Sequence, residues 1–234
     1  MSKKIKQKLP SFTIAIPAYN EEESLPWVLN DTLRHAPVYF SDFEIVVVDD
    51  GSSDNTSKIV RQYTSKDKRI RLIHQPNSGY GNAMLRGIRA ARKDFVAYMP
   101  ADGQFLVRDM RHCFPHMRNA DLILGYRGPR VDYSVYRHIL SQSYLFLLRL
   151  LYGLRYRDVN WLTIWRTRDV QKMSVTSRGI FLLAEIVIRF KRKGLRIVEA
   201  PSFYRPRRGG RVKNTKFRIV LRTLLDALLF RLAH

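Results

Sequence analysis

Apolar runs rich in β-branched residues alternate with helix-period segments over the first half of the chain. The runs cover residues 12–17, 44–50, 69–75, 94–99 and 120–127. Strands that are buried on both faces read as continuous apolar runs, and helical segments between them favour parallel pairing. The pattern therefore predicts an α/β protein with a mostly parallel central sheet flanked by helices.

After residue 130 the pattern changes to longer amphipathic segments. Helices are expected over 133–152, 181–192 and 217–232, and strands over 160–165 and 196–205. The first and last of these helices have broad apolar faces flanked by arginines. They are expected either to lie in a lipid interface or to pack on the core of the domain, and the sequence leaves both readings open. Earlier in the chain, Asn20 and the three glutamates after it are expected to cap the helix that follows the first strand.

The charge balance points to the kind of partner. The chain has 42 Lys and Arg against 20 Asp and Glu in 234 residues, a formal net charge of +22. Such an excess indicates a polyanionic partner: nucleic acid, a lipid surface or a phosphorylated substrate. An apolar fraction of 45% fits a globular chain, and the length fits one domain with a sizeable core.

The cysteine content, the N-terminus and the length of the apolar segments bear on the cellular compartment and on membrane insertion. The single cysteine, Cys113, excludes an internal disulfide and suits a reducing compartment, so a cytoplasmic location is expected. The basic N-terminus has no apolar core, so no signal peptide is expected. No segment reaches the ~20 apolar residues that a membrane-spanning helix needs.

Polar residues stand where the apolar runs stop. They are found in 17–21, 49–52, 101–104 and 126–127. In an open parallel sheet, ligands bind beyond the carboxyl ends of the strands. Acids, an amide and a guanidinium from four strand ends therefore predict one binding site.

The motifs PAYNEEES, VVVDDGSSDNT, ADGQF and GYR resemble those of family 2 glycosyltransferases, which have the GT-A type nucleotide-diphosphosugar transferase fold. The segments DVNWLTIWRTRDV, AEIVIRFKRKGLRIVEAP and RPRRGGRVK are similar to the dolichol-phosphate mannose or glucose synthase branch. The resemblance spans about residues 11 to 214. It implies a GT-A catalytic domain over 1–211 and a C-terminal amphipathic helix over 212–234, lying at a membrane interface.

The resemblance implies a site for a nucleotide diphosphate sugar. The matching positions are Pro17, Tyr19, Glu21, Asp49, Asp50, Ala101, Asp102 and Gln104. A carboxylate is suited to accept from a base N–H or a ribose hydroxyl. Two alternatives stay open: Asp50 as a cap of the next helix, and Glu21 as a first-turn acid that interacts with the helix dipole.

Asp102 and Gln104 match the metal-binding motif of the family, which implies Mg²⁺ or Mn²⁺ as cofactor. The family motif has a D-x-D pair, and here Pro100 takes the first position. These cations prefer oxygen ligands and keep several waters, so one carboxylate plus two diphosphate oxygens forms a workable shell. We expect the affinity for the metal to be low in the absence of the nucleotide diphosphate sugar. The plain alternative is that Asp102 starts a turn with Gly103.

Basic residues late in the chain match phosphate-binding positions of the family. Arg127, Arg137, Arg207 and Lys213 are expected to hold the acceptor phosphate, and Asp102, Arg127 and Arg207 to carry the catalysis. One guanidinium group can bind two phosphate oxygens through two parallel N–H donors. Val212 takes the place of a family serine. The remaining basic residues of this region are expected to be solvated or lipid-facing, namely Arg205, Arg208, Arg211 and Lys216.

Glu185 lies where other family 2 enzymes place a general base, but a structural acid is an equally good interpretation. A phosphate monoester has a second pKa of about 6, so its oxygen is already anionic near neutrality and needs no base. A sugar hydroxyl would need one. We therefore do not assign Glu185 as a base.

The resemblance leads to an inverting transfer of a hexose, mannose or glucose, from GDP-mannose or UDP-glucose to a polyprenyl or dolichyl phosphate. The enzyme is expected on the cytoplasmic face of an anionic membrane, as a peripheral protein; a membrane partner subunit stays open. One alternative is a family 2 transferase that acts on a sugar hydroxyl. Another is a basic nucleic-acid binder, but acids at the strand ends would repel a polyanion, so no nucleic-acid partner is expected.

Overall fold

The computed structural model describes residues 9–128, 135–205 and 217–233, and within them seven strands form one sheet in the order β3-β2-β1-β4-β6-β5-β7. The strands are β1 Phe12–Ala18, β2 Phe43–Asp49, β3 Ile70–His74, β4 Phe95–Tyr98, β5 Leu122–Arg127, β6 Thr163–Arg166 and β7 Ile197–Ser202. All five strands expected before residue 130 form, as do the two expected after it. The predicted α/β class is confirmed.

Strand direction decides which residues meet at the functional edge. β1 pairs in parallel with β2 and β4, β2 with β3, and β5 with β7, whereas β6 runs antiparallel to both of its neighbours, β4 and β5. Six strands therefore end at one edge, and β6 begins there. The segment just before β6 is brought to the same edge as the ends of β4 and β5.

The central strands are buried because their residues are apolar on both faces. All seven residues of β1 and all seven of β2 are buried. Phe12 of β1 stacks on Phe40 with ring centroids 4.5 Å apart, and Phe114 packs edge-on against both rings. This packing fixes the sheet as a rigid support for the loops at its edge.

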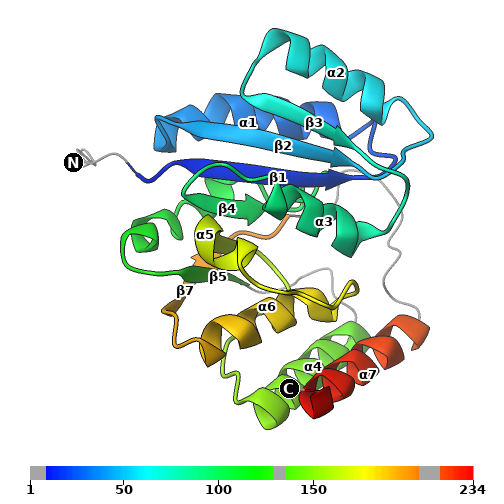
Figure 1. Ribbon diagram of the computed structural model, residues 1–234, viewed down its shortest axis with the longest axis vertical. Helices are drawn as coiled ribbons and strands as arrows, with labels where there is room; N and C mark the ends of the chain where they lie inside the picture. The colour runs from blue at the N-terminus through cyan, green and yellow to red at the C-terminus, as the bar shows by residue number, and fades with distance from the viewer. Residues whose placement is uncertain (1–8, 129–134, 206–216, 234) are drawn as a thin grey trace.

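Helices cover both faces of the sheet. They are α1 Leu25–Tyr39, α2 Thr56–Lys66, α3 Tyr80–Arg89, α4 Val135–Tyr152, α5 Thr167–Gln171, α6 Phe181–Arg192 and α7 Phe217–Ala233, with short 3₁₀ turns η1 Val107–Met110 and η2 Phe114–Arg118. α3 and α5 lie in front of the sheet in Figure 1 and α1 behind it, while α4 and α7 lie together at the lower end.

The predicted cap of the first helix is wrong. α1 begins at Leu25, and its N-cap, Ser24, makes no side-chain cap bond. Asn20 lies in the left-handed region with φ 55°, and its Oδ1 accepts a hydrogen bond of 2.8 Å from the backbone N–H of Ser53. Asn20 therefore joins the loops after β1 and β2 instead of capping a helix.

Helices α4 and α7 pack on the protein through some apolar side chains and expose others, so packing on the domain is confirmed and a lipid interface stays a prediction. Leu148 of α4 and Ala227 and Phe230 of α7 are buried, and α7 packs against α4 and α6. Other apolar side chains of the same helices are exposed: Val135, Tyr136, Ile139, Phe146 and Leu150 of α4, and Leu225, Leu228, Leu229 and Leu232 of α7. Among the described residues, no helix has the length and apolar character to cross a bilayer.

Candidate active site

The edge where the parallel strands end brings the predicted polar residues together. Asp49 ends β2, Asp102 follows β4 and Arg127 ends β5. Tyr98, the last residue of β4, is within electrostatic reach of Asp102 and Arg127. Burial raises the pKa of its phenol well above the usual value, with smaller contributions from Asp102 and an opposing one from Arg127.

The loop after β1 is held against the loop after β2. The backbone N–H of Glu21 donates to Thr56 Oγ1 at 2.9 Å, and the Glu21 carboxylate accepts from Ser24 Oγ at 2.6 Å. Glu21 precedes α1, which has no acid in its first turn, so the first-turn interpretation of this residue is wrong. Tyr19 is 37% exposed at the edge, and Pro17 lies within β1. Their contact with a nucleotide base stays a prediction.

Asp49 is fully buried and has two partners, Ser52 from the loop after its own strand and His74 from the end of β3. Its Oδ1 accepts from the Ser52 N–H at 3.0 Å, and its Oδ2 lies 2.9 Å from His74 Nδ1. Burial alone would raise the pKa of Asp49, but the hydrogen bonds from Ser52 and His74 outweigh it and the pKa is lowered. Asp49 is therefore ionised at neutral pH. His74 was missed in the sequence; its only signal was its place at the end of β3.

Asp50 is tied to the segment that leads into α3. Its carboxylate accepts from Gln75 Nε2 at 2.8 Å, and from the backbone N–H groups of Ser78 and Gly79, both at 2.9 Å. It makes no contact of this kind with α2, so the interpretation as a cap of the next helix is wrong. With 2% exposure, Asp50 fixes the shape of the edge. Its predicted contact with the nucleotide stays a prediction.

The loop over 101–104 forms a tight turn around Asp102. Asp102 Oδ1 accepts from the backbone N–H of Gln104 at 3.0 Å, and Gly103 between them has φ +72°. A Cβ at Gly103 would lie 2.5 Å from the ring of Trp27, so glycine is required both by conformation and by space. The turn predicted as the plain alternative is present, and it holds the carboxylate of Asp102 in place.

The end of β7 supports this loop from the other side. The backbone N–H of Arg205 donates to Gln104 O at 2.9 Å, and Gln104 Nε2 lies 3.5 Å from Tyr204 Oη. The Arg205 guanidinium binds the buried carboxylate of Asp109 through two bonds, of 2.8 and 2.7 Å. Arg205 was expected as a solvated or lipid-facing charge; its side chain is 39% exposed, but it also holds a buried carboxylate as a structural partner.

Asp102 and Gln104 offer the oxygen donors that Mg²⁺ and Mn²⁺ prefer. Across the described ranges, no three His, Cys, Asp or Glu side chains gather as a metal-binding group. The residues present therefore fit a cation that is shared with the diphosphate of a substrate. They do not fit a cation held by protein side chains alone.

Arg127 is held by residues that precede the antiparallel strand β6. Its Nε donates to Asp158 at 2.7 Å, and its guanidinium carbon lies 4.6 Å from the centroid of the Trp161 ring. The side chain of Arg127 is 9% exposed and that of Asp158 is 4% exposed. Both partners were missed in the sequence, because only the reversed direction of β6 brings them to this edge.

Glu185 has a structural environment. It is fully buried in α6 and accepts from the N–H groups of Thr176 and Ser177 at 2.9 and 2.7 Å, and from Arg189 Nε at 2.7 Å. Burial raises the pKa of Glu185, but these hydrogen bonds outweigh it and the pKa is lowered. A buried, low-pKa carboxylate bound to a guanidinium is a poor general base.

Three of the predicted acceptor-binding groups lie outside the described residues: Arg207, Lys213 and the side chain of Arg137. The backbone of Arg137 is part of α4. Their roles stay predictions.

Comparison with known proteins shows the family to which the chain belongs. The family model for glycosyl transferase family 2 matches residues 13–182. An uncharacterized glycosyltransferase of Mycobacterium tuberculosis is 28% identical over 204 residues, which cover 86% of this chain and 88% of the relative. The undecaprenyl-phosphate mannosyltransferase of Micrococcus luteus is 28% identical over 210 residues, 85% of each chain. The dolichyl-phosphate beta-glucosyltransferase of Trichomonas vaginalis is 28% identical over 220 residues, 86% of this chain and 68% of the relative.

A solved structure of glucosyl-3-phosphoglycerate synthase from Mycobacterium tuberculosis, in complex with Mn²⁺, UDP and phosphoglyceric acid, matches with a TM-score of 0.71. It is 18% identical, and the match covers 95% of this chain and 78% of that one. Another structure of the same enzyme contains Mg²⁺ and UDP, with a TM-score of 0.68. At this identity the likeness shows the fold alone, and it confirms the fold class expected from the sequence.

Proposed function

The chain belongs to glycosyl transferase family 2, and on that premise we propose that it is an inverting enzyme that transfers a hexose from a nucleotide diphosphate sugar to a polyprenyl phosphate. Mannose from GDP-mannose and glucose from UDP-glucose are both within the proposal. The observation that carries it is the edge itself, where Asp102 lies in a tight turn after β4 and the Arg127–Asp158 pair lies at the end of β5.

Support for a polyprenyl phosphate acceptor comes from two relatives whose names state an undecaprenyl-phosphate or a dolichyl-phosphate activity. The buried environment of Glu185 agrees, because a phosphate acceptor needs no general base whereas a sugar hydroxyl does. It therefore disfavours the alternative transfer to a sugar hydroxyl. Family membership likewise favours an enzyme over a nucleic-acid binder.

A second candidate acceptor is a small soluble molecule that carries a phosphate. It is favoured by the structural neighbour that contains phosphoglyceric acid. Both candidates share an anionic acceptor, so both agree with the proposed binding of an acceptor phosphate by Arg127 and the basic residues after β7.

In the proposed site, Asp102 and Gln104 would hold Mg²⁺ or Mn²⁺ together with the donor diphosphate, and the bound cation would offset the charge of the leaving group. The neighbours that contain Mn²⁺ or Mg²⁺ with UDP support this assignment. Asp49 and Asp50, with Pro17, Tyr19, Glu21 and Ala101, shape the nucleotide-sugar site. Arg127 orients the acceptor phosphate, whose oxygen attacks the anomeric carbon in line, so catalysis is by position and charge. Arg137, Arg207 and Lys213 are proposed to share that phosphate.

The proposal is tested with labelled nucleotide sugars and polyprenyl phosphate in detergent, with and without a chelator. We expect lipid-extractable label with one donor and its loss on chelation. A parallel arm with phosphoglycerate tests the soluble acceptor. Label in that arm alone would overturn the polyprenyl phosphate proposal.

The Asp102→Asn variant tests the metal site. The Asn amide oxygen still accepts from the Gln104 N–H, so the turn is retained while the charge is lost. We expect turnover to fall by about 10²–10³-fold with little change in melting temperature. Asp67→Asn is the matched control, because Asp67 Oδ1 accepts from the Arg69 N–H in the same way, just before β3 begins. Equal turnover in the two variants would refute the role of Asp102.

We also propose that the enzyme is peripheral on the cytoplasmic face of an anionic membrane, with residues 212–234 and α4 at the interface. The exposed apolar side chains of α4 and α7 and the net charge of +22 support this placement.

A further inference from the structure

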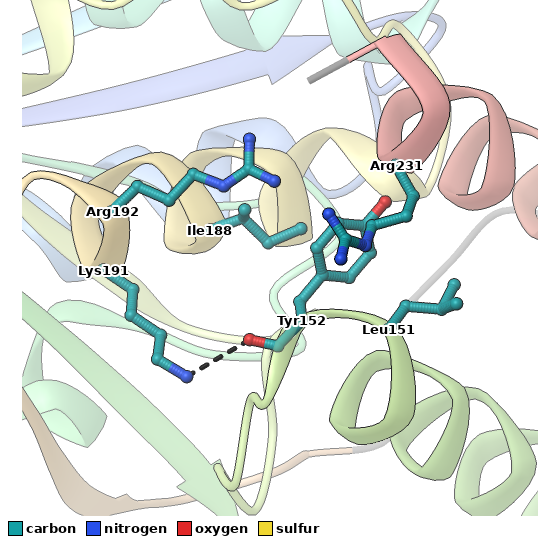
Figure 2. Close-up of a pocket in the computed structure, with 6 residues that line it drawn as sticks. All are labelled: Leu151, Tyr152, Ile188, Lys191, Arg192 and Arg231. Carbon is teal, nitrogen blue, oxygen red and sulfur yellow. Dashed lines mark hydrogen bonds between the residues drawn. The ribbon is translucent and has the colours of Figure 1, made fainter.

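Basic side chains line a hollow of about 380 Å³ at the carboxyl ends of three helices, α4, α6 and α7. Its walls are Leu151, Tyr152, Ile188, Lys191, Arg192 and Arg231. It involves none of the residues assigned to the active site. Figure 2 shows the guanidinium groups of Arg192 and Arg231 pointing into this space from two different helices.

Lys191 and Arg192 each have a partner in the protein. Lys191 Nζ donates to the backbone carbonyls of Tyr152 and Gly153, at 3.2 and 2.6 Å, and so closes the end of α4 (Figure 2). Arg192 lies over the Phe230 ring, 5.5 Å from its centroid. Within the described part of the chain, neither Arg192 nor Arg231 forms an ion pair with a carboxylate.

A position at helix ends explains why cations occur here, because they interact favourably with the helix dipole. It does not explain why two guanidinium groups on separate helices point into one space. Like charges in that arrangement repel each other, and an anion between them would remove the repulsion. Guanidinium groups are well suited to a phosphodiester, since one guanidinium can donate two parallel N–H bonds to two of its oxygens.

The surroundings of the hollow are apolar and exposed. Leu150, 71% exposed, adjoins Leu151 in α4, while Leu228 and Leu232, 43% and 84% exposed, flank Arg231 in α7. The floor includes the buried side chain of Ile188. A lipid with an anionic headgroup matches both features, since its phosphate would meet the arginines and its acyl chains would meet the leucines.

We propose that this hollow is a binding site for the phosphate of an anionic phospholipid, which seats α4 and α7 on the bilayer. The inference rests on the proposed function only in taking the enzyme to work at a membrane. It assigns Arg192 and Arg231 to the bilayer phospholipid, separately from the acceptor phosphate at the strand edge.

The test is flotation of the protein with vesicles of phosphatidylcholine alone or with about one third phosphatidylglycerol. Arg192→Gln combined with Arg231→Gln should weaken binding to the phosphatidylglycerol vesicles roughly 25-fold, because each arginine near an anionic surface contributes about fivefold. Arg61→Gln combined with Arg86→Gln is the matched control; these exposed arginines lie on α2 and α3, and the same two charges are removed. The control should bind within about twofold of wild type.

Equal weakening by the two double variants would overturn the proposal, because general charge would then explain the binding. The phospholipid proposal would also fail on a second pair of results. These are that inorganic phosphate raises the melting temperature of the wild type but not of the Arg192/Arg231 variant, and that the variant binds vesicles as well as the wild type does. The hollow would then hold a soluble phosphate.

The outcome for the proposed function is read separately. In detergent with a short-chain polyprenyl phosphate, the Arg192/Arg231 variant should transfer sugar at the wild-type rate. If no donor gives transfer with wild type but vesicle binding still depends on the two arginines, the proposed function fails and the headgroup site stands.

Discussion

At the residue scale, the shape of the edge depends on single positions that do not tolerate substitution. Gly103 has a positive φ and lies directly against Trp27, so the position of Asp102 is set by the absence of a side chain one residue later. Asp49 shows the same dependence through charge, because Ser52 and His74 keep it ionised although it is buried.

Gly103→Ala is expected to destabilise the protein by about 2–4 kcal/mol, since a left-handed residue and a forced contact are combined. Gly194→Ala is the control, because Gly194 has φ +66° but nothing within 4 Å of an added Cβ. It should cost only about 1–2 kcal/mol. Urea unfolding of both variants checks the difference, and equal losses would show that the Trp27 contact is readily relieved.

At the element scale, α6 is anchored by Glu185, which joins the helix to the segment before it. The carboxylate binds the N–H groups of Thr176 and Ser177 as well as Arg189 of the next turn. A catalytic base would need access to the substrate, whereas Glu185 has no exposed surface. The residue therefore contributes to the fold.

Glu185→Gln should lower the free energy of unfolding by about 1–3 kcal/mol near neutral pH, because buried donors and Arg189 lose an ionised partner. The pKa of Glu185 is lowered in the fold, so its stabilisation is complete above the ordinary value of 4.5 and is lost as the pH falls through the folded pKa. The difference in free energy of unfolding between Glu185→Gln and wild type should therefore become smaller at acidic pH.

The exposed Glu23 supplies the control for this comparison, and Glu23→Gln should change stability by no more than about 0.5 kcal/mol. Denaturant unfolding across the pH range gives the measurement. Full stability of Glu185→Gln with loss of turnover at every pH would instead identify Glu185 as a base.

At the scale of the whole molecule, the edge proposed to bind the nucleotide sugar carries several acids, although the chain has a net charge of +22. In the proposed placement, the basic excess and the exposed apolar side chains of α4 and α7 act together at a membrane surface. Charges of this kind are screened when the Debye length falls from about 10 Å at 0.1 M salt to about 3 Å at 1 M.

Binding to phosphatidylglycerol vesicles should therefore fall at least tenfold between roughly 0.1 and 1 M NaCl. The melting temperature should change little, because the core is apolar and the Arg127–Asp158 pair of the edge is buried. Flotation and thermal melting over the same salt series provide the measurements. Salt-independent flotation would mean that apolar contacts alone hold the protein on the vesicle.

The sequence by itself determined the alternating order of strands and helices, the motifs at the strand ends and the family to which they belong. These features are local: an apolar run or a short motif is written in adjacent residues. The expected site residues Asp49, Asp102 and Arg127 do come to one edge, because parallel strands end together.

Only the tertiary structure decided which groups pair across that edge. Arg127 meets Asp158, 31 residues away, because β6 runs antiparallel, and Arg205 meets Asp109 across 96 residues. Asp50 turns to the start of α3 instead of α2, and Arg192 and Arg231 point into one hollow from two helices. Such contacts depend on the direction and packing of whole elements, which no local pattern encodes.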